Sequence, residues 1–279
     1  GDKMSKYQVQ SLFEDSKVFA THNDLIEKFS LNLLSEREED ILMIIVSDLQ
    51  QNREFTKISL KEIKNLLDKT MTYKQLISEV EQLSKKSLVL LSEEIYNADG
   101  SLAAENGDMW LPIIFSSLII HKREKAVSVK FNSDIQYIFW DLKDKFSIGN
   151  VQDYLKLNGK KQKILYRFFK RWENYNVSES INISVDRLKK LLKCSETYQY
   201  KSLKKVLNSA VENINKQSDI SVEFYENKKS KKVISIDFKI SNIKKEIRND
   251  LFEKKNRKAK LENVVDGEKE LMDLYQENS

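Results

Sequence analysis

The sequence predicts an α+β fold that consists of two tandem winged-helix domains. Three observations lead to this prediction. Residues 58–73 (ISLKEIKNLLDKTMTY) recur without a gap at residues 183–198 (ISVDRLKKLLKCSETY), a second amphipathic segment follows each copy, and β-rich sequence follows each second segment. Helix, short turn, helix and hairpin is the order of elements in a winged helix-turn-helix.

Each copy begins with a short helix that has one apolar stripe. The apolar residues recur at positions i, i+3, i+6 and i+7, which lie on one face of a helix. They are Leu60, Ile63, Leu66 and Leu67 in the first copy and Val185, Leu188, Leu191 and Leu192 in the second. Ser59 and Glu62 are expected to form a capping box, and Ser184 is expected to cap the second copy.

A second helix is expected to start near the Thr-Tyr pair that ends each copy. In the second copy its buried stripe is Leu203, Val206, Leu207, Ala210 and Ile214. The second helix of such a motif enters the major groove. The opposite face therefore gives the main candidate DNA contacts, which are Thr197, Tyr198, Lys201, Ser202, Lys204, Lys205 and Asn208. The matching face in the first copy has mixed charge, and its candidate auxiliary contacts are Lys74, Ser78 and Lys85.

The β-rich segments are expected to form the wings. The first, residues 87–120, contains Asp99-Gly100 as a turn signal. The second has two alternating runs, ISVEF and VISIDF, on either side of ENKKSKK. The lysines at the tip of this hairpin are expected to hold phosphates, and they are Lys228, Lys229, Lys231 and Lys232.

Two further helices are expected between the repeated elements. Residues 132–146 are predicted to form an amphipathic helix with Ile135, Ile138, Phe139, Leu142 and Phe146 facing inward. Residues 160–172 are predicted to form a second one that buries Ile164, Leu165, Phe168 and Phe169. The basic residues of this second helix are candidate phosphate contacts, and they are Lys160, Lys161, Lys163, Arg167, Lys170 and Arg171.

The charge is unevenly distributed along the chain. Residues 151–240 hold 20 Lys/Arg and 10 Asp/Glu, a net charge of +10, whereas residues 1–150 have a net charge of −5. A basic block of this kind favours a polyanionic partner such as nucleic acid for the second half. The alternative is a solvated basic surface.

The sequence has no pattern typical of a catalytic or metal site. The only histidines, His22 and His121, are far apart, and neither a phosphate-binding loop nor a zinc spacing of Cys and His occurs. The acidic pairs Glu38-Glu39 and Glu93-Glu94 are interpreted as solvated faces. We therefore expect no enzyme activity, no catalytic residue, no metal and no cofactor, but a mechanism of DNA binding and deformation.

The composition also predicts a cytoplasmic protein. A single cysteine, Cys194, excludes an internal disulfide and fits a reducing compartment. No apolar run approaches the roughly 18–20 residues of a membrane helix, and the N-terminus lacks the pattern of a signal peptide. No membrane partner is expected.

Three segments have a more specific pattern. They are residues 127–157, residues 163–172 (KILYRFFKRW) and residues 202–240, where VENIN, SDISVEFYE and a KK-x-KK wing follow one another. In these segments the chain resembles the initiator proteins of iteron-carrying, theta-replicating plasmids. It departs from that family in having GKKQK where a Ser usually precedes the 163–172 helix, and lysines where arginines are common on the recognition helix. Lysine lacks the bidentate fork with which arginine binds guanine.

The resemblance implies a function. Such proteins bind direct repeats, the iterons, in double-stranded DNA at a plasmid origin, open adjacent AT-rich DNA, and recruit the host initiator and the replicative helicase. Self-association through the N-terminal winged helix gives dimers that repress. Two alternatives stay open: a dimeric winged-helix transcriptional repressor, and a winged-helix scaffold that does not bind DNA.

The expected domain organisation has four parts. Residues 1–20 are an N-terminal arm, and residues 21–130 are a winged helix for dimerisation and auxiliary DNA contact. Residues 131–240 are the winged helix that makes the main DNA contacts. Residues 241–279 are a tail that is partly helical or disordered.

Overall fold

The computed structural model describes residues 17–52, 57–68, 70–91, 95–96, 102–104, 109–139, 142, 146–173, 180–195 and 197–242. The elements of the N-terminal unit (residues 18–155) are β1 (Val18–His22), α2 (Asp24–Glu27), β2 (Phe29–Ser30), α3 (Glu36–Asn52), β3 (Ile58–Ser59), α4 (Leu60–Leu67), α5 (Tyr73–Leu83), β4 (Val89–Leu91), β5 (Ile95–Tyr96), β6 (Leu102–Ala104), β7 (Met109–Trp110), β8 (Phe115–His121), β9 (Ala126–Phe131), η1 (Gln136–Ile138), β10 (Phe146–Asn150) and α6 (Val151–Leu155). Those of the C-terminal unit (residues 160–242) are α7 (Lys160–Glu173), β11 (Ile181–Ser184), α8 (Val185–Leu191), α9 (Tyr200–Gln217), β12 (Ile220–Lys229) and β13 (Lys232–Asn242).

Some expectations lie outside the described residues. They concern the arm up to residue 16, the Asp99-Gly100 turn, the Glu93-Glu94 pair and the tail from residue 243.

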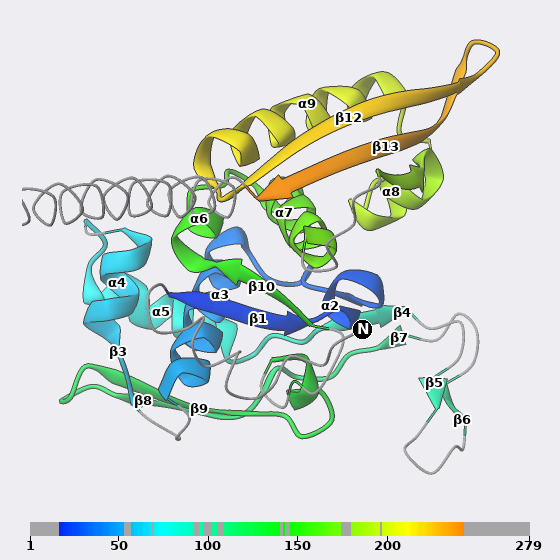
Figure 1. Ribbon diagram of the computed structural model, residues 1–279. Helices are drawn as coiled ribbons and strands as arrows, with labels where there is room; N and C mark the ends of the chain where they lie inside the picture. Colours follow the sequence, from blue (N-terminus) through cyan, green and yellow to red (C-terminus); the bar gives the residue numbers. More distant parts are fainter. Residues whose placement is uncertain are drawn as a thin grey trace, which may run out of the picture.

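The N-terminal unit is built around α3. Residues 41–46 of this helix are each at most 1% exposed, so neighbouring elements enclose it on every side. Helices α4 and α5 pack against it, and the antiparallel sheets β3-β9-β8 and β2-β4-β7 complete the unit. Figure 1 shows these elements, coloured from blue through cyan to green, below the C-terminal unit.

The helix starts follow the expected capping chemistry only in part. Ser184 caps α8, because its Oγ accepts a hydrogen bond from the Arg187 N–H at 3.2 Å. The predicted capping box of α4 is wrong: the Ser59 side chain makes no capping hydrogen bond, and Glu62 is ion-paired with Lys17 instead. A capping box does form at the start of α5, between Thr72 and its third helical residue.

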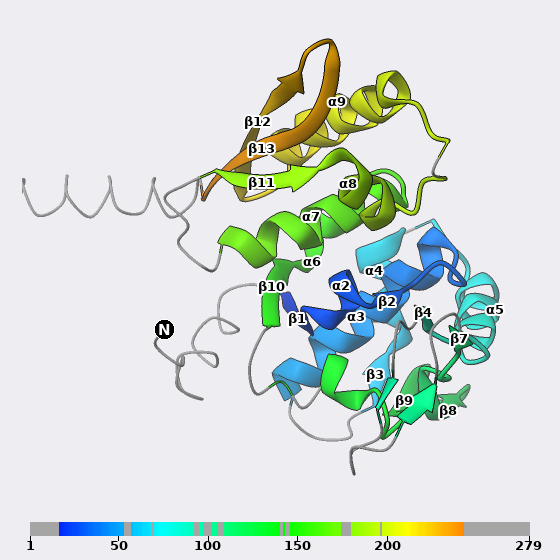
Figure 2. The ribbon, with the colours of Figure 1, turned by 90° about the vertical axis from the view of Figure 1, so that its right-hand side faces the viewer.

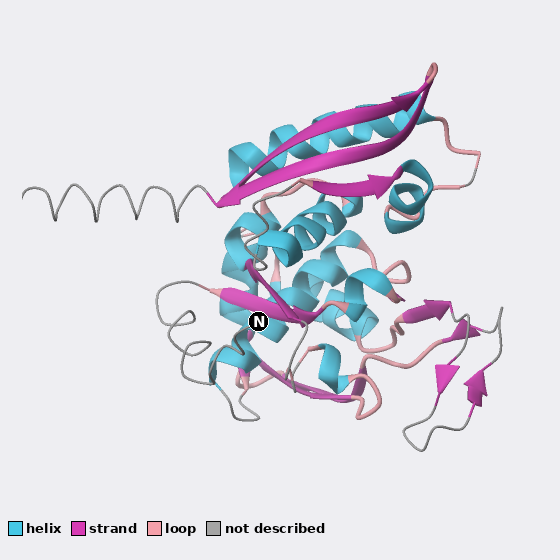
Figure 3. Ribbon diagram, turned by 45° about the vertical axis from the view of Figure 1, so that its right-hand side comes forward, coloured by secondary structure: helices cyan, strands magenta, loops and turns pink. Residues whose placement is uncertain are grey.

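The C-terminal unit places α9 against a three-stranded sheet of order β11-β13-β12. The expected buried stripe of α9 is confirmed, with only Val206 partly exposed. The helix starts at Tyr200, three residues after the expected Thr197. The delay has a local cause: the Tyr198 N–H donates to the Ser195 carbonyl in a turn, and Gln199 is extended. Figure 3 shows the long strands of β12 and β13 running alongside α9.

Over the described residues 132–139, 142 and 146, the predicted helix is wrong. Ile135, Ile138 and Phe139 are buried as expected, but they belong to the short 3-10 turn η1 and its flanks. Residues 146–150 form β10, which pairs antiparallel with β1. Gly149 permits this pairing, since a Cβ there would lie 2.6 Å from the Phe19 ring. The expected domain limits at residues 20 and 130 thus fall inside strands β1 and β9.

Both histidines have local hydrogen-bond partners. His121 Nε2 lies 2.9 Å from Ser128 Oγ, and His22 Nδ1 accepts from the Asp24 N–H at 3.2 Å. Over the described ranges, no set of three His, Cys, Asp or Glu side chains could hold a metal ion. None of the helices among these residues combines the length and apolar character needed to cross a membrane.

Candidate nucleic-acid interface

One face of α9 is polar and open to solvent. Five of the predicted contacts are exposed along it: Lys201, Ser202, Lys204, Lys205 and Asn208. They lie opposite the apolar stripe that packs on the sheet, so the same helical period that builds the core presents these side chains outward. An exposed cationic helix of this kind has the form that helix-turn-helix proteins insert into the major groove.

The turn before α9 is tied to α7. The Lys161 ammonium lies 4.8 Å from the centre of the Tyr198 ring, a cation–π contact that links the turn between α8 and α9 to α7. Thr197 is exposed, and its hydroxyl lies 3.2 Å from Ser195 Oγ. Tyr198 is half-buried and leaves only part of its ring for a ligand.

The wing is an antiparallel hairpin with one register shift, between Asn227 and Lys228. Strands β12 and β13 pair from Ile220↔Asn242 to Lys229↔Lys232, and Ser230 adopts φ 56° in the tight turn between them. All four predicted tip lysines are exposed. Figure 1 shows the tip projecting beyond α8 and α9, where it is free to meet a second surface.

Glu226 of β12 joins the wing to α9. Its Oε1 accepts hydrogen bonds from the Tyr200 hydroxyl at 2.8 Å and from the Lys204 ammonium at 2.6 Å, and its Oε2 lies 3.6 Å from Lys228 Nζ. The hydrogen bonds from Lys204 and Tyr200 hold the pKa of Glu226 below its ordinary value. Sequence reasoning missed this residue. The sequence does contain a signal for it, namely an acidic residue at an inward-facing position of the wing strand β12.

The cations of α7 occupy a different environment. Lys163 is 1% exposed and lies 3.0 Å from Glu36 and 2.5 Å from Asp40, both on α3. Arg167 is buried, donates to Glu39 and also bonds the hydroxyl of Tyr154. Their assignment to phosphate contacts is therefore corrected: they are buried ion pairs between the two units. Figure 2 shows α7 between α9 above and α2 and α3 below.

The lysines near the two ends of α7 also have partners within the protein. The Lys160 ammonium donates to the backbone carbonyl of Asn32 at 3.2 Å. Lys170 is buried and pairs with Glu173 and with Asp219 at 3.1 Å. Lys161 differs from these two lysines, because its ammonium contacts the Tyr198 ring in the turn before α9.

The carboxylates of α3 were also misassigned. Glu38 and Glu39 are 3% and 1% exposed rather than solvated. Glu38 accepts from the Ser35 N–H at 2.6 Å and so caps α3, whereas Glu39 takes the Arg167 ion pair. A sequence signal existed, because Glu36, Glu39 and Asp40 share one face of α3 by helical spacing.

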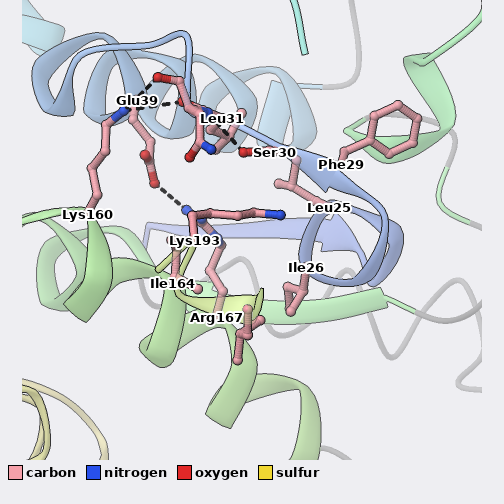
Figure 4. A pocket seen from close by; sticks show the side chains of 12 residues that line it. Leu25, Ile26, Phe29, Ser30, Leu31, Glu39, Lys160, Ile164, Arg167 and Lys193 are labelled. Atoms are coloured by element: carbon pink, nitrogen blue, oxygen red, sulfur yellow. Dashed lines mark hydrogen bonds and ion pairs between the residues drawn. The ribbon is translucent and has the colours of Figure 1, made fainter. Parts of the chain in front are cut away.

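A pocket lies beside these ion pairs. Its apolar wall comes from Leu25, Ile26 and Phe29, and its polar wall includes Arg167 and Lys193. Figure 4 shows the Arg167–Glu39 contact at its edge. Burial lowers the pKa of Lys193. Because the polar groups around Arg167 already bind one another, the pocket belongs to the junction between the units.

The N-terminal unit presents a weaker basic surface. Lys74, Ser78 and Lys85 are exposed as expected, but Glu81 is exposed among them. The β8–β9 turn adds exposed Lys122, Arg123 and Lys125. Sequence reasoning missed this second basic hairpin turn, although HKREK between two apolar strands was its signal.

Comparisons with known proteins agree with this architecture. A family model described as "Initiator Replication protein, WH1" matches residues 18–170, and one described as "Initiator Rep protein, WH2" matches residues 184–240. A search of curated proteins finds no match. A crystal structure of the Pi initiator protein in complex with iteron DNA is similar, with a TM-score of 0.56 and 20% identity over 81% of this chain and 97% of that chain.

The two family models confirm the expected α+β fold of two winged-helix domains and the resemblance found in the sequence. The first model alone covers more than half of the chain. This chain therefore belongs to the initiator replication protein family.

Proposed function

We propose that this protein initiates plasmid replication by binding iteron repeats in double-stranded DNA. The observation that carries the proposal is the pairing of an exposed lysine face on α9 with a lysine-tipped wing beside it. A helix of this kind can enter a major groove, while the wing holds phosphates of the flanking backbone. The structural likeness to an initiator in complex with iteron DNA supports the same assignment.

The main DNA contacts are assigned to the C-terminal unit, with auxiliary contacts from α5 of the N-terminal unit. Opening of AT-rich DNA and recruitment of the host initiator and helicase are part of this proposal, as is a binding mechanism without catalysis. The cytoplasm is the proposed location. The proposed domain organisation keeps an N-terminal and a C-terminal winged helix, and the two family models match residues 18–170 and 184–240.

Self-association is assigned to the N-terminal unit. Strand β8 lies at the edge of its sheet, and Ile119 on that strand is 53% exposed. An exposed apolar edge strand can pair with a second copy of itself. The same observation keeps the dimeric repressor as a second candidate function.

Footprinting of the full chain on the DNA that flanks its own gene tests the proposal. Protection of several direct repeats is the expected result. Protection of a single palindrome would favour the repressor, and absence of binding to any duplex at moderate salt would favour a scaffold.

A further inference from the structure

A carboxylate lies inside the cationic surface. Glu226 is on the side of β12 that faces α9, and its side chain is 15% exposed. Glu223, on the same strand, points to the opposite face, is exposed and accepts only from Tyr225 among the described residues. The two acids therefore carry the same charge on the same strand in different surroundings.

Glu226 binds groups that a DNA phosphate would otherwise bind. Phosphate and carboxylate oxygens accept the same charge-assisted hydrogen bonds from ammonium and hydroxyl groups. Glu226 already takes one from Lys204 and one from Tyr200, and it lies near Lys228. Lys205, the next residue on α9, has no carboxylate partner among the described residues and is exposed.

The consequence concerns DNA of arbitrary sequence. Binding to such DNA depends almost entirely on lysines and arginines that neutralise phosphates and release counterions. A lysine already neutralised by an internal carboxylate contributes little to this binding. At the correct site, base contacts fix the register and can compensate for displacing the carboxylate.

We propose that Glu226 competes with DNA phosphates for Lys204 and Lys228 and thereby limits binding to DNA of arbitrary sequence. The inference rests on the proposed DNA-binding function and deepens it, since it makes Glu226 a specificity-determining residue. Glu226 itself need not touch a base.

Glu226→Gln tests the proposal, because the amide keeps the shape and can still accept a hydrogen bond while the charge is lost. Glu223→Gln is the matched control, since it removes the same charge from the other face of the same strand. The measurement is the affinity for a random duplex as a function of salt, by fluorescence anisotropy with the full chain. Relative to Glu223→Gln, Glu226→Gln should bind more tightly, with a log–log slope steeper by about 0.9 for each lysine released.

A second pair of variants tests the proposal even if the Glu226→Gln variant does not fold. Lys205→Met should flatten the slope on random duplex by about 0.9, whereas Lys204→Met should flatten it by less. The proposal is overturned if Glu226→Gln matches Glu223→Gln, if it weakens binding, or if Lys204→Met and Lys205→Met flatten the slope equally. Failure of the proposed function has a separate signature, in which wild type and all variants bind no duplex at low salt; that result also overturns the inference.

Discussion

The lysines and arginines of α7 and those of α9 and the wing have the same chemistry in opposite environments. On α7, Lys163 and Arg167 are buried against Glu36, Glu39 and Asp40. On α9 and at the wing tip, most lysines face solvent. A basic stripe on a helix therefore does not by itself identify a DNA-binding face.

The difference follows from what each helix meets. Helix α3 presents three carboxylates at helical spacing to α7, so the cations of α7 find partners within the protein. A buried ion pair adds little to stability compared with apolar packing, but the loss of one partner leaves a costly unpaired charge. Lys163 and Arg167 thus join α7 to α3, whereas Lys201 and Lys205 of α9 are exposed and available to an external anion.

The largest effect is expected when one of the buried ion pairs of α7 is broken. Among the described residues, Arg167→Met leaves the buried Glu39 side chain with Tyr154 as its one partner, and it should lower the free energy of unfolding by about 3–5 kcal/mol. Urea denaturation measures the change. Lys205→Ala, an exposed control, should change the same quantity by less than about 0.5 kcal/mol. A loss below about 1 kcal/mol for Arg167→Met would contradict the buried pair.

The exposed lysines of α9 are tested by DNA affinity rather than by the stability of the protein. Lys201→Ala and Lys205→Ala should each weaken binding to the cognate repeat by about 1–3 kcal/mol if they contact bases. Their unfolding curves should match that of wild type, because both side chains are exposed. Unchanged affinity in both variants would show that this face of α9 does not enter the groove.

The sequence predicted the exposed face but not the buried one. The period of 3.6 in α9 and the alternation in β12 and β13 are local patterns, and both elements form where those patterns indicate. The burial of Lys163 and Arg167 depends on ion pairs with Glu36, Glu39 and Asp40, which are more than a hundred residues away in the sequence. The β1–β10 pairing is equally remote, and the strand over residues 146–150 begins at Phe146, the last residue of the segment whose local pattern favoured a helix.

The junction between the units should also respond to pH. Burial raises the pKa of Asp40 to about 6, against the opposing effect of Lys163. Because this value exceeds that of the unfolded chain, the group contributes stability at low pH that is lost as pH rises through about 6. The stability of wild type relative to Asp40→Asn should fall by about 1–2 kcal/mol between pH 5 and pH 7.5. A difference independent of pH would contradict this assignment.

A smaller effect is expected at the edge of the N-terminal unit. Ile119→Asp places a charge on the exposed edge strand β8 and should shift the full chain toward monomer. Ile234→Asp is the control, since Ile234 is 46% exposed on the wing, away from that edge. Light scattering over a range of concentrations compares the two. Equal self-association in both variants would place the dimer contact elsewhere.

The most direct test of the central claim, that the exposed lysines hold DNA phosphates, is a salt titration of wild type and a variant with Lys228, Lys229, Lys231 and Lys232 changed to Ala. These side chains lie at an exposed hairpin tip, so they are expected to act as charges without sequence preference. The variant should bind cognate and random duplexes more weakly by similar factors, and its plot of log affinity against log salt should flatten by about 0.9 per lost phosphate contact. Lys239→Ala, an exposed lysine far from the tip on β13, should change neither. An unchanged slope in the four-lysine variant would contradict the claim.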